Sequence, residues 1–336
     1  MPDIAFVIFE EEKAKGKSRQ GLLTKSGFFK LHIGTALLRI FNKKKYQNGI
    51  NIFEIEPGTD ILVIRLPFPP SMLTYLNRQY IERYISKLCS ENGCKKCFVP
   101  YAVMKLGGFE QYTVDTNSRS VIFKALLMPI LDEIYSKSGI RLDNLDTAFV
   151  NGEDTAELLT MVKQMEPFMR YINVAASDKG LVEGKLSDIC ADSGISIFVS
   201  SDFKSILRNA DLVINLGTVS AISKYRIKPR SLVIDFFGEE SPTLRGEFTL
   251  IKGMEYSFPM NQYNALGEDI KRSFSKAELT EILMSFKAGL LNEGSYNDTT
   301  AALVLKVFKN SCCNITGFKG RRGVLRVENV LKTVRM

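Results

Sequence analysis

The sequence predicts an α/β protein built around a parallel β-sheet. Between residues 142 and 238, short apolar runs alternate with helical patterns, which is the spacing of βαβ units. These runs are continuously apolar, as is typical of a sheet covered by helices on both faces. With 336 residues, 45% hydrophobic and 24% charged, the chain has an ordinary globular composition and the length of about two domains. We expect an N-terminal α/β domain at 1–140, a parallel-sheet domain at 141–240, and a C-terminal segment at 241–336 whose helices return to the first domain.

The N-terminal part is predicted to alternate strands and helices. Apolar runs predict strands at residues 4–9, 61–68 and 97–103. Apolar residues at helical spacing predict a helix over 72–88, with Ser71 as its cap and Asn92-Gly93 as its end. A second helix is expected over 119–135, and it should kink or restart near Pro129 because proline cannot continue the hydrogen-bond ladder.

The middle of the chain has the most regular pattern. Its predicted strands are at residues 147–150, 171–175, 195–199, 212–216, 231–237 and 248–251, and its helices at 155–165, 181–191 and 202–208. Farther on, Ser275 and Glu278 form a capping-box pattern ahead of a helix to about residue 291. Asp298 is expected to cap another helix that runs to residue 308. Residues 315–334 are interpreted as a basic hairpin or a short helix.

Three segments carry a resemblance to a group of enzymes. Residues 210–218 (ADLVINLGT) look like the alanine-aspartate, apolar strand and small residue that line a dinucleotide site. Residues 227–235 (IKPRSLVID) look like the loop and strand that follow, and residues 61–67 (ILVIRLP) are similar to a strand of the folate enzyme's first domain. In this order they resemble the Rossmann-type NAD(P)-binding superfamily, with the layout of shikimate dehydrogenase, methylenetetrahydrofolate dehydrogenase and glutamyl-tRNA reductase. The resemblance implies NAD or NADP as cofactor and an oxidoreductase that acts on a small-molecule substrate in a cleft between two domains.

The glycine motif of this group is degenerate here. A dinucleotide fingerprint uses three glycines after the first strand, whereas the turn VNGEDTA at residues 150–156 keeps only Gly152. Glu153 and Asp154 place two negative charges where a diphosphate would lie, and they compete with an anion for the helix N-terminus. Two functions therefore stay open. The first is an NAD(P)-binding oxidoreductase-like protein; the second is a non-catalytic Rossmann scaffold that has lost its cofactor and binds a partner through its basic ends.

For the first function, the candidate cofactor-binding residues follow the first, second and fourth strands of the predicted sheet. They are Asn151, Gly152, Asp154, Thr155, Ser177, Asp178, Lys179, Asn215, Gly217 and Thr218. Asp178 is placed to contact a ribose hydroxyl, and Lys179 beside it would instead favour a 2′-phosphate. In the alternative interpretation this segment is a solvated loop in which Ser177 caps a helix.

The loop at residues 105–118 holds the candidate catalytic residues. It follows the end of a predicted strand, where α/β folds place their ligands, and its paired glycines allow close approach to a ligand. Lys105 and Tyr112 can act as acid or base if burial shifts their pKa values, and Asp115 completes the catalytic set. In the alternative interpretation the loop is a turn-rich connector in which Asn117 or Ser118 caps the next helix.

Histidine and cysteine usage predicts no metal site. His32 is the only histidine, which excludes a pair of histidine ligands. Cys89, Cys94 and Cys97 have the spacing of part of a plant-type iron–sulfur site, but a fourth ligand would have to come from elsewhere. We expect the six cysteines to be free thiols, with Cys89 and Cys97 as small core residues.

Charge is divided unevenly along the chain. The net charge of +8 combines +10 at residues 13–45, +7 at 303–336, −4 at 1–12 and −5 in the remainder. Basic ends of this kind attract a polyanion such as nucleic acid, or an acidic partner, and the candidate segments are 13–45 and 319–326. The acidic start contains no secretory signal, and no apolar run is long enough to span a bilayer, so we expect a cytoplasmic protein. A homodimer is one option for its assembly.

Overall fold

The computed structural model describes residues 3–10, 50–56, 59–66, 68–74, 78–104, 109–112, 114, 116–152, 154–217, 222–237, 247–291, 295–321 and 323–335. The chain divides into two compact units, each made of two segments. Unit 1 is Met1–Asp115 with Phe258–Phe286, and unit 2 is Thr116–Ser257 with Lys287–Met336. None of the helices in the described part of the chain combines the length and the apolar character needed to cross a lipid bilayer.

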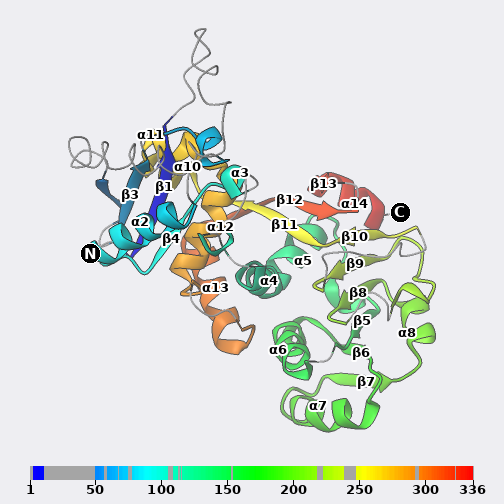
Figure 1. The fold of residues 1–336 in the computed structure, drawn as a ribbon. Helices are drawn as coiled ribbons and strands as arrows, with labels where there is room; N and C mark the ends of the chain where they lie inside the picture. Colours follow the sequence, from blue (N-terminus) through cyan, green and yellow to red (C-terminus); the bar gives the residue numbers. More distant parts are fainter. Residues whose placement is uncertain are drawn as a thin grey trace. The chain divides into compact units, whose positions relative to one another are not determined.

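Unit 1 contains a four-stranded sheet in the order β2-β3-β1-β4 (Figure 1). Its strands are β1 (Ile4–Phe9), β2 (Ile50–Glu56), β3 (Thr59–Leu66) and β4 (Lys96–Phe98). β1 runs parallel to β3 and β4, whereas β2 is antiparallel to β3. The predicted strand at 4–9 is confirmed with its bounds, the strand predicted over 61–68 is observed at Thr59–Leu66, and β2 is an additional strand.

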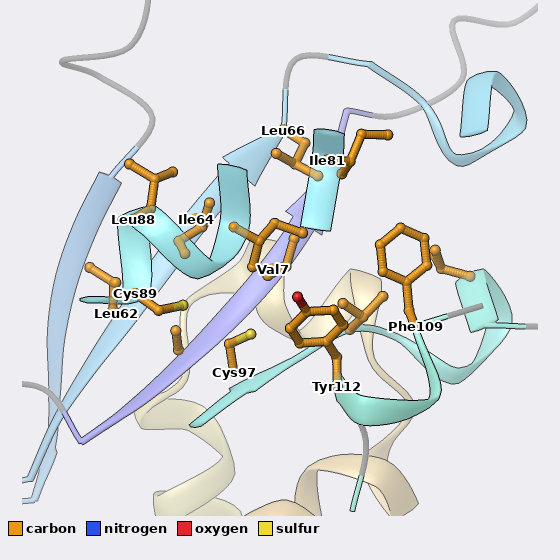
Figure 2. Packing of buried hydrophobic residues seen from close by; sticks show 14 of the residues in the cluster. Val7, Leu62, Ile64, Leu66, Ile81, Leu88, Cys89, Cys97, Phe109 and Tyr112 are labelled. Carbon is orange, nitrogen blue, oxygen red and sulfur yellow. The ribbon is translucent and has the colours of Figure 1, made fainter. Parts of the chain in front are cut away.

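Helices cover both faces of this sheet. Ala5 and Val7 of β1 are buried with Ile81 and Ile85 of α2 (Arg78–Glu91), as Figure 2 shows for part of the cluster. Phe6 points to the other face, where its ring meets Phe274 at 5.1 Å, just after α11 (Glu268–Ser273). Alternate residues of β1 therefore serve two cores, which explains why the strand is continuously apolar.

Two predicted elements of unit 1 are wrong in their extent. The helix expected over 72–88 is observed as α2, Arg78–Glu91, and Pro70–Thr74 is a separate 3₁₀ turn (η2), in which the Met72 N–H donates to the carbonyl oxygen of Pro69 at 3.0 Å. The strand expected over 97–103 ends at Phe98. Pro100 then starts the short helix α3 (Tyr101–Met104), since its carbonyl oxygen accepts the N–H of Val103 at 2.8 Å.

Unit 1 also holds part of the C-terminal segment. Helices α10 (Met260–Ala265), α11 and α12 (Lys276–Lys287) follow one another there. The predicted capping box at the start of α12 is present: the Ser275 N–H donates to Glu278 Oε2 at 2.7 Å, and the Glu278 N–H donates to Ser275 Oγ at 3.3 Å. α12 ends four residues before the predicted position, and Gly289 follows with a φ of +71°.

Unit 2 is built on a six-stranded sheet in which every neighbouring pair is parallel. The strands are β5 (Thr147–Val150), β6 (Tyr171–Ala175), β7 (Ser196–Ser200), β8 (Leu212–Asn215), β9 (Leu232–Asp235) and β10 (Thr249–Ile251). Their spatial order is β7-β6-β5-β8-β9-β10. Counted from β5 as the first strand, this is 3-2-1-4-5-6, the order of the Rossmann fold. The predicted α/β fold class and the Rossmann-type domain are thereby confirmed.

The helices of unit 2 connect these strands. They are α6 (Thr155–Met165), α7 (Lys179–Ser193) and α8 (Phe203–Asn209), and Figure 1 shows α6 and α8 on opposite sides of the sheet. An aspartate caps each of them by accepting a backbone N–H: Asp154, Asp178 and Asp202. The cap of α7 is therefore Asp178, not Ser177.

Further helices complete unit 2. The predicted helix over 119–135 is two helices, α4 (Thr116–Ala125) and α5 (Leu127–Tyr135), which confirms the break expected near Pro129. α13 (Asp298–Asn310) packs on α4, and its cap is Asn297, not Asp298, through a capping box with Thr300.

The end of the chain forms a small antiparallel sheet. Its order is β11 (Gly253–Ser257), β12 (Asn314–Gly320) and β13 (Gly323–Leu325). α14 (Val327–Arg335) follows. The basic segment at 315–334 is thus both a hairpin and a helix.

Candidate functional site

The candidate site lies at the carboxyl ends of β5 and β8, the two central strands of the unit 2 sheet. From β5 the chain continues to β6 on one side, whereas from β8 it continues to β9 on the other side. This reversal is the topological switch point, where open α/β sheets bind ligands. The turns that leave the two strands are Asn151-Gly152 and Leu216-Gly217.

These two turns are packed backbone against backbone. A Cβ atom added to Gly152 would lie 2.4 Å from the carbonyl oxygen of Leu216, and one added to Gly217 would lie 2.9 Å from that of Asn151. The Leu216 N–H also donates to the carbonyl oxygen of Val150 at 3.0 Å. Both glycines are therefore required by the close backbone contact between the turns.

A fully buried polar pair, Asn215 and Asp235, holds the second turn in place through hydrogen bonds. Asn215 Nδ2 donates to Asp235 Oδ1 at 2.9 Å and to the carbonyl oxygen of Gly217 at 3.0 Å. Asn215 Oδ1 accepts the N–H of Gly217 at 3.2 Å, and Asp235 Oδ1 accepts the N–H of Phe237 at 3.2 Å. Both side chains have 0% exposure. The pair fixes the ends of β8 and β9, so Asn215 acts on the site by holding its backbone.

Asp235 was not among the sequence candidates. Its signal was present, since it is the one charged residue at the end of an otherwise apolar strand, LVID. Burying a polar pair at strand ends costs free energy unless each side chain is hydrogen-bonded. Asn215 and Asp235 both make such hydrogen bonds.

The N-terminus of α6 follows the first turn, and a side chain already accepts one of its backbone N–H groups. The Asp154 carboxylate accepts the N–H of Ala156 at 2.8 Å, while Thr155, the first helical residue, is buried. In a dinucleotide site, N–H groups at this helix end face the diphosphate. The side-chain oxygen of Asn151 is buried and has no hydrogen-bond partner among the described residues, so it is an acceptor available to a ligand. Glu153 and Thr218 lie outside the described residues.

The candidates after β6 lie on the same edge of the sheet and are exposed. Asp178 Oδ1 accepts the N–H of Leu181 at 3.0 Å, and Lys179 forms an ion pair with Glu183 at 3.4 Å. Ser177 is also exposed. The structure thus brings the three groups of candidate cofactor residues to one edge, after three adjacent strands.

Of the catalytic candidates, only Tyr112 lies in the described part of the chain. It belongs to the 3₁₀ turn η3 (Glu110–Tyr112) and is buried in unit 1 beside Phe109. Its hydroxyl is 3.2 Å from Ser86 Oγ and donates to the carbonyl oxygen of Glu82 at 3.4 Å. Burial raises the pKa of Tyr112 above its usual range. Lys105 and Asp115 lie outside the described residues.

A polar cluster in unit 2 was not predicted. Lys124 of α4 forms an ion pair with Glu157 of α6 at 2.5 Å, and its ammonium group lies 5.9 Å from the ring centre of Tyr296. The Tyr296 hydroxyl accepts a hydrogen bond from Gln164 Nε2 at 2.8 Å, and burial, together with the Glu157 charge, raises the pKa of Tyr296. The cluster joins α4, α6 and the segment before α13. No local motif could reveal it, because its members, other than the two on α6, lie 33 to 172 residues apart in the chain.

Three kinds of sequence candidate remain: the histidine, the cysteines and the basic segments. His32 and the basic segment 13–45 lie outside the described residues, and within the described ones no three His, Cys, Asp or Glu side chains are grouped as metal ligands. Cys89 and Cys97 are buried free thiols. In the basic segment 319–326, the Arg321 guanidinium lies 4.4 Å from the ring centre of Phe248.

Among the comparisons with known proteins, only the one with solved structures gives matches. No family model matches the chain, and no curated protein matches it. Among solved structures, it is similar to a Δ1-pyrroline-2-carboxylate reductase of Thermococcus litoralis in complex with NADH and L-proline, at 8% identity over 36% of each chain and a TM-score of 0.25. The chain thus spans about a third of that protein.

Two other matches are longer. A lactate dehydrogenase of Eimeria maxima with NADH and oxamate is 12% identical, over 57% of this chain and 92% of that one, with a TM-score of 0.32. A shikimate 5-dehydrogenase of Mycobacterium fortuitum is 12% identical, over 90% of this chain and 98% of that one, with a TM-score of 0.28. At such TM-scores the fold assignment rests on the strand order of unit 2.

Proposed function

We propose that unit 2 binds NAD or NADP at the β5–β8 switch point, and that the protein is an oxidoreductase acting on a small molecule. The observation that carries the proposal is the all-parallel 3-2-1-4-5-6 sheet, whose switch point is bordered by two glycine turns and a buried Asn215–Asp235 pair. Ligands of open α/β sheets bind at this position. The bound nicotinamide would supply hydride transfer.

The residues present fit such a ligand in part. Gly152 and the N–H groups at the start of α6 would face the diphosphate, and the buried Asn151 oxygen would accept a hydrogen bond from the ligand. Asp178 would accept hydrogen bonds from a ribose, or Lys179 would pair with a 2′-phosphate. Lys105, Tyr112 and Asp115 remain the proposed acid–base groups for the substrate.

Asp154 works against a tightly bound diphosphate. Its carboxylate takes up the Ala156 N–H and adds a negative charge at the α6 N-terminus. An acid at this position interacts with the helix dipole by about 0.3–1 kcal/mol, and an anionic ligand would have to displace or tolerate it. We therefore expect a weak affinity for the dinucleotide, and replacing Asp154 should increase that affinity.

The test is a thermal shift and calorimetric titration with NAD⁺, NADH, NADP⁺ and NADPH at millimolar concentration. We expect at least one form to stabilise the protein. Asp154→Ser keeps a capping oxygen and removes the charge, so it should bind that form about two- to fivefold more tightly. Asp202→Ser at the cap of α8 is the matched control and should leave the affinity unchanged. A folded protein that none of the four forms stabilises would refute the proposal.

A second function is favoured by the Asp154 cap itself. If cofactor binding has been lost, the Rossmann scaffold is non-catalytic, and its basic segments 13–45 and 319–326 bind nucleic acid or an acidic partner. Binding to nucleic acid that weakens steeply with salt, and that disappears when the basic residues of 319–326 are neutralised, would support this function. A cytoplasmic location and a homodimer belong to both proposals, and cell fractionation and light scattering test them.

A further inference from the structure

Three cysteines meet at the end of α2 in unit 1. Cys89 lies in the last turn of this helix, and Gly93 ends it with a φ of +72°. The Cys94 N–H then returns to the carbonyl oxygen of Cys89 at 2.9 Å. This closure is the one that commonly brings the two side chains at its ends into contact. Cys94 is accordingly half-buried and packs against the same apolar cluster as Cys89.

Cys97 reaches the same cluster from the sheet. It lies in β4 opposite Ala5 of β1, and its side chain is 6% exposed, compared with 7% for Cys89. Figure 2 shows both thiols in the layer between α2 and the sheet. The two thiols are hydrogen-bonded to each other.

We propose that Cys89 and Cys97 form a redox modification site, a dithiol that hydrogen peroxide converts to a disulfide. The Cys89 thiolate attacks one peroxide oxygen, the O–O bond breaks, and hydroxide leaves with a sulfenic acid on Cys89. The Cys97 sulfur then attacks the Cys89 sulfur, and the sulfenic hydroxyl leaves. The protons of the two thiols go to the two leaving hydroxides. Overall, two thiols and one peroxide give one disulfide and two water molecules.

The hydrogen bond gives the two thiols different roles. This hydrogen bond lowers the pKa of Cys89 and raises that of Cys97. The thiolate is the nucleophile, so Cys89 attacks the peroxide and Cys97 resolves the sulfenic acid. Burial and the neighbouring Cys89 raise the pKa of Cys94 to about 11, so Cys94 stays protonated near neutral pH.

Burial also selects the oxidant. Both side chains expose less than a tenth of their surface, so a molecule of the size of water can reach them by small local motions, whereas a peptide disulfide such as oxidised glutathione cannot. Cys312 is the exposed cysteine among those described and is the competing site for any bulky oxidant.

Peptide mapping distinguishes the possible products. Reduced full-length protein is treated with hydrogen peroxide, free thiols are alkylated, and the protein is digested with trypsin. Cleavage after Lys87, Lys95, Lys96 and Lys105 places Cys89 and Cys94 in one peptide and Cys97 in another. We expect these two peptides to be linked, with two of the six thiols lost from the chain. A Cys89–Cys94 bond would instead stay within one peptide and would overturn the proposal.

Serine variants complete the test. Cys94→Ser is the matched control and should keep the linked pair, whereas Cys89→Ser and Cys97→Ser should each abolish it. Loss of the linked peptides in Cys94→Ser would show that Cys94 is a partner and would contradict the assignment. Six intact thiols in the folded wild-type protein after peroxide would refute it without recourse to any variant. Oxidised glutathione should leave the pair unlinked.

Discussion

The contact between the two turns at the switch point makes Gly152→Ala the most informative substitution. An added Cβ would lie 2.4 Å from the Leu216 carbonyl oxygen, about 1 Å closer than ordinary carbon–oxygen contact. The obstacle is backbone that is tied to β5 through the Leu216–Val150 hydrogen bond, so it cannot rotate away as a side chain would. The two turns must separate, and the switch point loses its shape.

The magnitude follows from the size of this overlap. Overpacking of a rigid interior costs about 1–3 kcal/mol, and a clash with backbone belongs at the upper end, so we expect a loss of about 3 kcal/mol. For a unit of this size, that lowers the melting temperature by about 6–12 °C. Gly217→Ala, with an added Cβ at 2.9 Å from the Asn151 carbonyl oxygen, should cost about 1–2 kcal/mol. Because both substitutions push the same turns apart, the double variant should lose less than the sum.

Urea unfolding followed by circular dichroism measures these losses, since the chain has no tryptophan. Gly184→Ala is the control: it lies within α7, an added Cβ there meets nothing within 4 Å, and alanine should gain about 0.5–1 kcal/mol. If the Gly152→Ala variant has wild-type stability, the close backbone contact between the two turns is refuted. A loss of stability as large in Gly184→Ala would show that the assay reports glycine replacement in general.

Three further predictions concern buried polar groups in unit 2. Asn215→Ala removes three hydrogen bonds and leaves Asp235 with fewer donors, so urea unfolding should show a loss of about 3 kcal/mol. Lys124→Met leaves the Glu157 carboxylate partly buried without its ion pair and should cost about 2–3 kcal/mol, part of which Glu157→Gln in the same chain should restore. Burial raises the pKa of Tyr135, so its contribution to stability is present below pH 10 and falls above it, by about 1.4 kcal/mol per pH unit. Unfolding between pH 9 and 11 should therefore show a shallower loss in Tyr135→Phe.

Local signals were sufficient for most of the sheet in unit 2. The predicted bounds of β5, α6 and β6 are those observed, because each is an apolar run or helical repeat set off by residues that stop it. Periodicity alone was not sufficient to place the start of α2. Residues 72–88 have helical spacing, yet the first of them belong to the 3₁₀ turn η2, and α2 begins at Arg78. β2 was overlooked because its acidic, alternating sequence INIFEIE lacks the continuous apolar run of the central strands.

The sequence predicted only those features of the candidate site that depend on residues close together in the chain. The loss of two fingerprint glycines and the acid at Asp154 were visible in the turn itself. The contacts of Gly152 with Leu216 and of Gly217 with Asn151 arise because two strands 65 residues apart in the chain lie side by side. No single segment of the sequence contains this information. The same holds for the Asn215–Asp235 pair, which needs the register of β8 on β9.

Hydrogen exchange of the full-length protein with and without NADH or NADPH tests the central claim most directly. If a nicotinamide dinucleotide binds at the switch point, amides in residues 150–156 and 215–217 should exchange more slowly when the ligand is present at millimolar concentration. Unchanged exchange in both segments, in protein shown to be folded, would contradict a nucleotide site between β5 and β8.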